Sequence, residues 1–256
     1  MKLITLNTWG GRGGKDLVLP FFPKYMNETD IFCLQEIWSA PHEHLEGHST
    51  AGKPLNNAEV VTHLMQEICA LLPNFKEYFR PHFTDHYGIM TMVKNTFEVL
   101  DEGETYVHKE KGFFPKDDLG KHARNIQWLK INHNEKKFAV INFHGLWNGQ
   151  GKGDSDDRIS QSQKIIDYLK TLDCEYVLCG DFNLLPDTQS LKMFEEFGLR
   201  NLIKEYGVTS TRTSLYKSAV RYADYVFVSP GIKVNNFEVL PDEVSDHNAI
   251  LLDFEV

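Results

Sequence analysis

Two short motifs in the last third of the chain place a carboxylate beside a neutral hydrogen-bonding side chain. Asp181 and Asn183 follow one apolar run, and Asp246 and His247 precede another. Both runs are typical of buried strands, so each motif lies at the tip of a strand. A buried carboxylate is costly without a partner. A divalent cation with a phosphate-bearing substrate would supply that partner, which indicates phosphate chemistry.

Four further polar residues flank strand-like runs: Asn7, Glu36, His144 and Asp224. Sites are often built from the loops at one end of a sheet, so these side chains could converge with the two motifs. Carboxylate and amide oxygens suit Mg²⁺ or Mn²⁺, whereas the sequence contains no cluster of thiolates for zinc. Each residue alone could be a turn, strand-end or core residue. Their joint pattern predicts the site.

These strand tips need sheets to hold them, and the apolar pattern supplies many short strands. Strands are predicted at 3–6, 31–34, 75–80, 87–94, 97–107, 124–132, 137–143, 176–180, 223–229, 232–240 and 248–255. Helices are predicted at 16–27, 58–72, 157–172 and 188–197. Long polar loops, which are usually functional, are predicted at 39–57, 108–122 and 147–157. The pattern favours the α+β class, with packed sheets and helices outside them.

The composition is that of an ordinary globular protein. The chain has 256 residues, 41% hydrophobic and 25% charged, and no Gly/Ser-rich or Pro-rich linker divides it. We interpret residues 1–256 as a single domain. The net charge of −9 argues against a broad basic surface for nucleic acid. It does not exclude a nuclease, because bound cations offset repulsion locally.

The sequence carries no sign of export or membrane insertion. The first apolar run is too short for a signal peptide, and no stretch approaches the ~20 residues of a membrane span. Four cysteines without a CxxC pair are predicted to be buried, reduced thiols. We expect a cytoplasmic monomer with no transmembrane segment.

Six motifs occur in a fixed order along the chain. They are Leu6-Asn7-Thr8-Trp9, Leu34-Gln35-Glu36, Phe143-His144-Gly145-Leu146, Gly180-Asp181-Phe182-Asn183, Ala223-Asp224-Tyr225-Val226 and Ser245-Asp246-His247. Together they resemble the motif set of the endonuclease/exonuclease/phosphatase superfamily, which includes deoxyribonuclease I, exonuclease III, neutral sphingomyelinases and inositol polyphosphate 5-phosphatases. The resemblance implies a four-layer α/β/β/α sandwich of two packed mixed β-sheets flanked by helices, as in deoxyribonuclease I. It does not specify the substrate.

The resemblance also implies roles at a metal and at the attacking water. Asn7 and Glu36 would hold Mg²⁺ or Mn²⁺, with Asp246 close enough to help. Asp181 would orient or deprotonate the water, and Asn183 would hold the water or a phosphate oxygen. One departure is that Thr8 and Trp9 follow Asn7, where many nucleases of the group carry an acidic residue. A second acidic ligand at that end is therefore not expected.

Two histidines are implied to bind phosphate oxygens. His247 would be braced by Asp224, which orients the ring and keeps it charged if the carboxylate raises its pKa. His144 would contact a phosphate oxygen likewise. Arg158 and Gln161 share a helix face, so Arg158 either supports the site from behind or pairs with aspartates on the surface.

We therefore expect a metal-dependent phosphoesterase that cleaves a phosphodiester or a phosphomonoester by direct attack of water. A nuclease acting on short or single-stranded nucleic acid is the first prediction, and a phospholipid, sphingomyelin or inositol-phosphate substrate is the alternative. Trp9, Trp38 and Trp147 would stack on a base or line a leaving-group pocket, or simply pack. The alternatives from other classes are a non-catalytic binding module and a zinc hydrolase that uses His42, His44 and His48.

Overall fold

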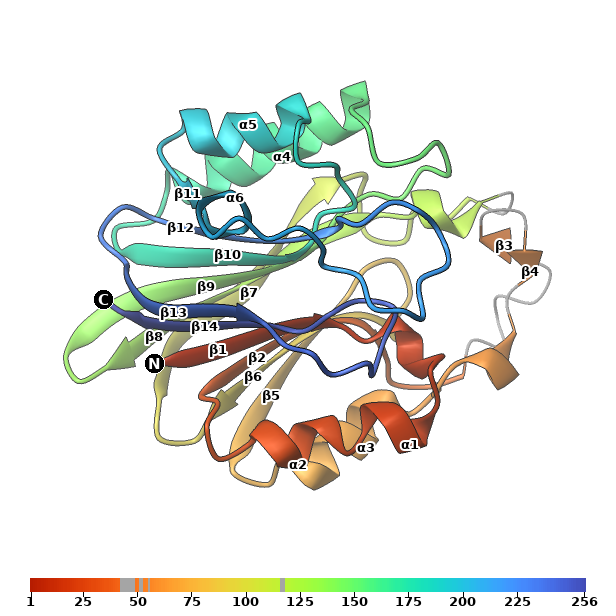
Figure 1. The fold of residues 1–256 in the computed structure, drawn as a ribbon, viewed down its shortest axis with the longest axis horizontal. Helices are drawn as coiled ribbons and strands as arrows, with labels where there is room; N and C mark the ends of the chain where they lie inside the picture. The colour runs from red at the N-terminus through yellow and green to blue at the C-terminus, as the bar shows by residue number, and fades with distance from the viewer. Residues whose placement is uncertain (42–48, 51–52, 55, 116–117) are drawn as a thin grey trace.

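Two β-sheets packed face to face, with helices on both outer faces, form the protein (Figure 1). The structure is a computed structural model that describes residues 1–41, 49–50, 53–54, 56–115 and 118–256. The arrangement is the predicted α+β sandwich with four layers. Histidines 42, 44 and 48, and with them the zinc alternative, lie outside the described residues.

The first sheet has six strands in the order β13-β14-β1-β2-β6-β5. Their bounds are β1 (Lys2–Asn7), β2 (Ile31–Trp38), β5 (Phe75–Pro81), β6 (Tyr87–Lys94), β13 (Lys233–Val239) and β14 (Ile250–Glu255). Strands β1 and β2 run parallel, and the other neighbours run antiparallel. The first and last strands, β1 and β14, are therefore neighbours, and both chain ends lie at the same side of the molecule (Figure 1).

The second sheet also has six strands, in the order β11-β12-β10-β9-β8-β7. Their bounds are β7 (Glu98–His108), β8 (Arg124–His133), β9 (Lys136–His144), β10 (Glu175–Asp181), β11 (Arg200–Asn201) and β12 (Asp224–Val228). Strands β9 and β10 run parallel, and the remaining pairs run antiparallel. A separate two-stranded ribbon joins β3 (Ser49–Thr50) to β4 (Lys53–Pro54).

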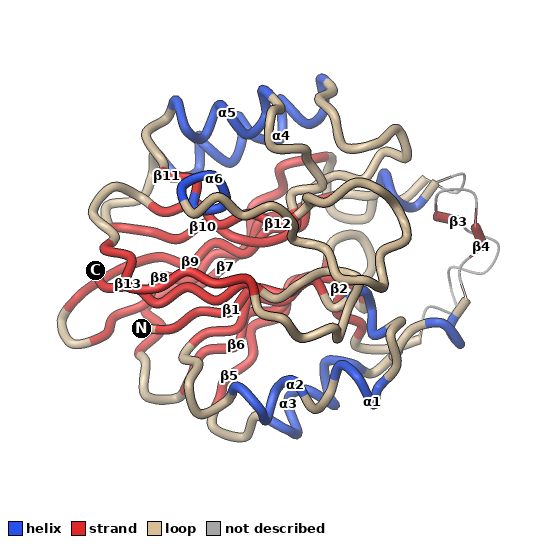
Figure 2. Tube along the Cα trace, in the orientation of Figure 1, coloured by secondary structure: helices blue, strands red, loops and turns tan. Residues whose placement is uncertain are grey.

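Helices cover the outer face of each sheet (Figure 2). Those over the first sheet are α1 (Lys15–Val18), α2 (Phe21–Tyr25) and α3 (Leu64–Leu71). Those over the second sheet are α4 (Asp156–Leu169) and α5 (Gln189–Glu196), with α6 (Leu202–Glu205) beside β12. Short 3₁₀ turns occupy η1 (Trp9–Gly11), η3 (Asn57–Glu59) and η4 (Leu119–Lys121). Among the described helices, none combines the length and apolar character needed to cross a membrane.

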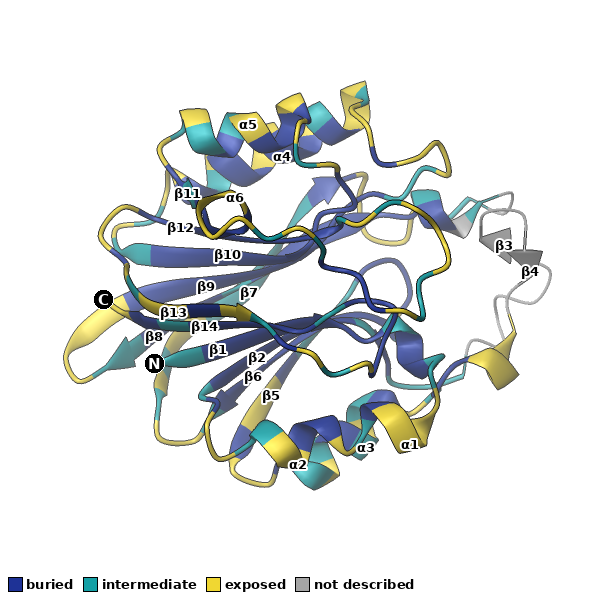
Figure 3. Ribbon diagram, in the orientation of Figure 1, coloured by how far each residue is buried: buried dark blue, intermediate teal, exposed yellow. Residues whose placement is uncertain are grey.

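The core lies mainly between the two sheets, where the central strands are buried along most of their length (Figure 3). A belt of fully buried polar side chains crosses this core. Gln35 on β2 donates to Asn142 on β9 at 2.8 Å, and Thr91 on β6 donates to Gln127 on β8 at 2.7 Å. Because an unpaired buried amide is costly, these bonds favour one alignment of the sheets. That alignment sets which strand ends face each other.

The main differences from the predicted elements concern the helices. The helix predicted at 16–27 is two short helices, and Pro20 precedes the second as its N-cap residue. The helix predicted at 58–72 starts only at Leu64, because Val60 is extended and the amide of Val61 bonds to Gly10 O at 2.8 Å. Strand β11 and helix α6 were not predicted. All four cysteines are free, but only Cys33 and Cys179 are fully buried.

Candidate active site

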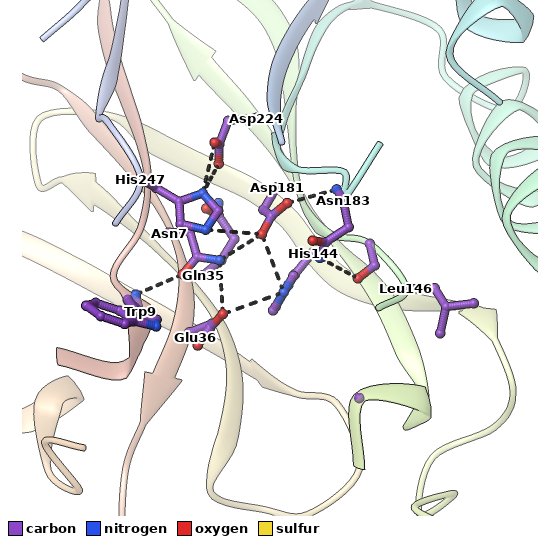
Figure 4. A network of polar contacts seen from close by, with 12 residues as sticks. Asn7, Trp9, Gln35, Glu36, His144, Leu146, Asp181, Asn183, Asp224 and His247 are labelled. Carbon is purple, nitrogen blue, oxygen red and sulfur yellow. Dashed lines mark hydrogen bonds and ion pairs between the residues drawn. The ribbon is translucent and has the colours of Figure 1, made fainter. Parts of the chain in front are cut away.

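Strand ends from both sheets meet at one end of the sandwich. Asn7 ends β1, Glu36 lies near the end of β2, His144 ends β9 and Asp181 ends β10. The Asn7 amide nitrogen donates to Asp181 Oδ2 at 2.9 Å and to Glu36 Oε1 at 3.2 Å (Figure 4). The expected convergence of these residues is therefore present, across a sequence separation of 174 residues.

The backbone bends sharply where these side chains are presented. Glu36 has φ of 58° and Asn183 has φ of 55°, both in the left-handed region that L-residues avoid. At Glu36 the β2–β6 register shifts between Leu34 and Ile37, which marks a bulge. Bulges re-aim side chains beside functional sites. The strained conformation therefore coincides with the predicted site residues.

Asp181 is the centre of the polar network. Its carboxylate is 2% exposed and accepts the Asn183 backbone N–H at 2.8 Å in addition to the Asn7 amide. Two imidazoles face the same oxygen, Oδ2, with His247 Nε2 at 3.6 Å and His144 Nε2 at 3.8 Å. The oxygen is thus surrounded by polar groups without being closed off by a direct ion pair. A water molecule or cation could be held there.

Asp224 and His247 form a buried pair. The strand β12 sets Asp224 directly opposite Asp181, and its carboxylate oxygens lie 2.8 and 2.9 Å from His247 Nδ1. Burial raises the pKa of Asp224 to about 6 and lowers the pKa of His247 to about 3. The bracing of His247 by Asp224 is as predicted. The carboxylates do not raise the pKa of the ring above its ordinary value, because burial and then Arg212 outweigh Asp246 and Asp181.

His144 and Asn183 complete the wall opposite this pair. His144 Nε2 lies 4.0 Å from Glu36 Oε1, and burial, followed by the nearby Arg124, places its pKa well below the usual range. Within the described part of the chain, His144 Nδ1 is buried without a hydrogen-bond partner. The Asn183 amide donates to Gly145 O at 3.3 Å. Both side chains are therefore held near Asp181.

Asp246 lies close to His247, and one of its two carboxylate oxygens is already paired with an arginine. Its Oδ2 accepts Arg212 Nη1 at 2.9 Å, and its Oδ1 lies 3.6 Å from His247 Nε2. Oδ1 is buried and has no hydrogen-bond partner among the described residues. Burial raises the pKa of Asp246. A buried carboxylate oxygen without a donor is what a cation ligand lacking its ion presents.

The donor set fits a hard divalent cation. Among the described residues, ligand atoms of Asp181, Asp224 and His247 lie within 4.8 Å of one another, although Asp224 and His247 already bond each other. Glu36 and the orphaned Asp246 Oδ1 add further oxygens. Asn7 differs from the expectation: its Oδ1 accepts the Trp9 N–H at 2.9 Å, and its nitrogen faces the carboxylates. In this arrangement Asn7 bridges the carboxylates, and its role as a metal ligand stays a prediction.

Arg158 and Gln161 of α4 hold the loop that follows β9. Arg158 is 1% exposed and donates to Leu146 O at 3.2 and 3.3 Å, to Gly151 O at 2.9 Å and to Gly153 O at 2.5 Å. Gln161 Oε1 accepts the Leu146 N–H at 3.2 Å. Of the two alternatives, support from behind the site is therefore the one observed. Pairing with surface aspartates is not observed, since no described residue forms an ion pair with Arg158.

Six of the predicted site residues line a cavity of about 280 Å³: Glu36, His144, Asp181, Asn183, Asp246 and His247. All three tryptophans singled out from the sequence line it: Trp9, Trp38 and Trp147. Sequence reasoning missed its cations, which are Arg12, Arg124, Lys152 and Arg212. Three of them lie in loops, and Arg124 is the first residue of a strand. The one signal in the sequence is that the three loop cations lie in polar segments rich in glycine or threonine.

A model of the Endonuclease/Exonuclease/phosphatase family matches residues 4–247. The chain belongs to this family. Its fold is shared by a mannosyl-6-phosphatase from Bacteroides thetaiotaomicron, with 15% identity, coverage of 100% of both chains and a TM-score of 0.76. It is also shared by a family protein from Leptotrichia buccalis, with 16% identity, full coverage of both chains and a TM-score of 0.74.

A third structure of this family fold is the human Nocturnin catalytic domain with bound sulfate. It has 16% identity and a TM-score of 0.65, and the match covers 100% of this chain and 93% of that domain. None of the curated protein sequences matches this chain. At such identities the likeness establishes the fold and leaves the substrate open.

Proposed function

We propose that this protein is a Mg²⁺- or Mn²⁺-dependent phosphoesterase that hydrolyses a phosphate ester by direct attack of water. The observation that carries the proposal is the convergence of Glu36 and Asp181 with the Asp224–His247 pair at one cavity. Displacement at phosphorus needs negative charge to be stabilised by position and electrostatics, which this arrangement supplies. A scaffold role would not require such a set of buried ionisable groups.

Glu36 and Asp246 would hold the cation, with Asn7 beside them. Bound there, the ion would act as a Lewis acid on a phosphoryl oxygen. Asn7 keeps the two carboxylates of Glu36 and Asp181 together, since its amide spans both. This bridge reduces the repulsion between the two carboxylates.

Asp181 would orient the attacking water and take its proton. The Asn183 N–H fixes one oxygen of Asp181 at 2.8 Å, which leaves Oδ2 directed toward both imidazoles. His247, held through Nδ1 by Asp224, would present Nε2 to a phosphate oxygen, as would His144. An arriving phosphate would favour the protonated form of His247, because its negative charge offsets the cost of burial.

The substrate and setting remain predictions. The predicted substrate is a short or single-stranded nucleic acid, and the alternative is a phospholipid, sphingomyelin or inositol phosphate. The tryptophan-lined cavity supports a base-sized or ring-sized organic group in either case. A monomer, a single domain spanning 1–256 and a cytoplasmic location are likewise retained as predictions.

The test is hydrolysis of bis(p-nitrophenyl) phosphate and p-nitrophenyl phosphate with Mg²⁺, with Mn²⁺ and with EDTA. We expect metal-dependent release of p-nitrophenol that falls at least ~100-fold in Asp181→Asn and in His247→Ala. The exposed Asp173→Asn, which removes the same charge from the surface, is the matched control and should keep its activity. Full activity in both site variants would refute the mechanism. Metal binding by calorimetry without any hydrolysis would favour the binding-module alternative.

A further inference from the structure

The four cations that line the cavity fall into two pairs. Arg12 lies 3.4 Å from Glu36, and Arg212 lies 2.9 Å from Asp246, so each of these arginines has a carboxylate partner. Arg124 and Lys152 line the same cavity, yet in the described structure neither forms an ion pair. Burying a charge without a partner costs several kcal/mol. Two such charges in one cavity indicate that a negatively charged ligand completes them.

Lys152 is the clearer of the two. It is 5% exposed, and its Nζ is buried with no hydrogen-bond partner among the described residues. The charged groups that face it are Asp181, Asp224 and Asp246, which favour the ammonium, and Arg212, which opposes it. Burial outweighs them and lowers the pKa of Lys152 to about 8. The fold therefore keeps an ammonium group at the site at an energetic cost.

The backbone around Lys152 is fixed on both sides. The glycines that flank it, Gly151 and Gly153, offer their carbonyls to Arg158, and Lys152 O accepts the Leu185 N–H at 2.9 Å. A glycine-rich segment without such anchors would be free to turn the lysine into solvent. Its buried position is thus imposed by the fold.

Arg124, at the start of β8, is 2% exposed. Its Nη2 donates to Gly120 O at 3.3 Å, whereas Nε and Nη1 lack hydrogen-bond partners in the described residues. His82 and His122 nearby add no positive charge, because burial holds the pKa of both far below the usual range. The carboxylates of Glu36 and Asp181 favour the Arg124 cation through space, but neither forms an ion pair with it. Arg124 therefore adds a second positive charge without an ion-pair partner among the described residues to this wall of the cavity.

The charge of the completed site selects among phosphate esters. Outside the two ion pairs, Arg124 and Lys152 stand against the carboxylates of Asp181 and Asp224, because burial lowers the pKa of His247 to about 3 and a neutral ring cancels no charge. A divalent cation would add two further positive charges. A phosphodiester brings one negative charge, whereas a phosphate monoester brings close to two above its second pKa of about 6. The cavity of about 280 Å³ also lies at the small end for ligand sites, which typically span about 300–1,000 Å³.

We propose that this cavity selects a terminal phosphate monoester, and that Lys152 binds a non-bridging oxygen of its dianionic phosphate. The inference rests on the proposed phosphoesterase function. Water would form the new P–O bond and pass a proton to Asp181, while the bond to the leaving oxygen breaks and that oxygen takes a proton from solvent. The products are inorganic phosphate and an alcohol. Lys152 keeps its proton throughout and contributes charge alone.

The test compares p-nitrophenyl phosphate, a monoester, with methyl p-nitrophenyl phosphate, a diester with the same leaving group. We expect Lys152→Met to lower kcat/KM for the monoester by about 100-fold and for the diester by less than about 10-fold. Lys152→Arg, which keeps the charge, should recover part of the monoester rate and extend it to higher pH. The exposed Lys164→Met removes the same charge from the outer face of α4 and serves as the control.

Stability separates a catalytic lysine from a structural one. Because methionine fills a similar volume without a buried charge, Lys152→Met should leave the melting temperature unchanged or raise it. Phenyl phosphate with Mg²⁺ should raise the melting temperature of the wild type more than methyl phenyl phosphate does, and Lys152→Met should lose that difference. This binding measurement does not depend on turnover.

Several results would overturn the proposal. Three results would overturn it and leave the phosphoesterase function intact. The first is an equal loss of kcat/KM for monoester and diester in Lys152→Met, and the second is an unchanged pH profile in Lys152→Arg. The third is an equal rise of the melting temperature with the two phenyl esters. Absence of metal-dependent hydrolysis of either ester would refute both. Release of inorganic phosphate from a 5′-phosphorylated tetranucleotide would identify the end of a nucleic acid strand as the substrate. Its release from glucose 6-phosphate would identify a small sugar phosphate instead. Faster cleavage of internal diesters would contradict the selection.

Discussion

Replacing Arg158 with methionine is expected to destabilise the protein and to release the loop behind the cavity. The guanidinium donates to three backbone carbonyls, at Leu146, Gly151 and Gly153, and is itself almost fully buried. Methionine occupies much of the same space but can donate to none of them. The loop that presents Lys152 then loses its anchors.

The size of the effect follows from these bonds. A hydrogen bond from a charged donor contributes about 1.5–3 kcal/mol, and less where water can replace it. The bonds to Gly151 and Gly153 are part-buried, and removing the arginine also removes the cost of burying its charge. A net loss of about 3 kcal/mol results, which for a chain of this size lowers the melting temperature by about 6–12 °C.

Thermal unfolding measures the loss of stability, and hydrogen exchange at the Leu146 amide measures the release of the loop. The amide is held by Gln161 at 3.2 Å and should exchange faster in the variant. Arg221→Met, at an exposed position, is the matched control. A melting temperature within about 2 °C of the wild type, with unchanged protection at Leu146, would show that the carbonyl bonds carry no stability and would refute the reasoning.

Three further outcomes are expected. Asp224→Asn should lower phosphoesterase activity at least ~100-fold, because His247 loses the acceptor that orients it; activity within tenfold of wild type would contradict this. Saturating Mg²⁺, at about 100 times its Kd, should stabilise the wild type by about 2.7 kcal/mol, and Glu36→Gln should abolish the shift in a calorimetric melt. Acid should destabilise the protein: His82 and His122 are kept neutral by burial, so the unfolded chain binds more protons below pH ~6.5 and stability is lost as pH falls. Two such groups cost about 3 kcal/mol between pH 6.5 and 5.0, and melting curves flat across that range would exclude it.

The polar residues at the strand ends were predictable because each lies next to an apolar run in the sequence. Asp181 and Asp224 each end or begin an apolar run, and the sheet register places them directly opposite each other. The order of the motifs then indicated which ends would meet. The effect of burial could not be predicted from the sequence: burial lowers the pKa of His247, although the carboxylates of Asp246 and Asp181 act in the other direction.

The cations of the cavity could not be predicted in this way. Lys152 and Arg212 lie in segments without periodicity, so no element indicated where their side chains would point. Glu36 presents a related problem, since a positive φ within a strand comes from a bulge that apolar patterning does not reveal. These positions depend on contacts between segments distant in the chain, which local patterns do not encode.

The adjacency of β1 and β14 has a consequence for synthesis on the ribosome. Strand β1 has as one of its two neighbours a strand that begins only at Ile250, so the backbone groups on that side must wait for a partner. His247 is translated just before that strand. Translation therefore delays both the closure of the first sheet and any hydrolytic capacity until β14 has been made, and a nascent chain arrested earlier would expose an unpaired edge open to chaperones or to self-association.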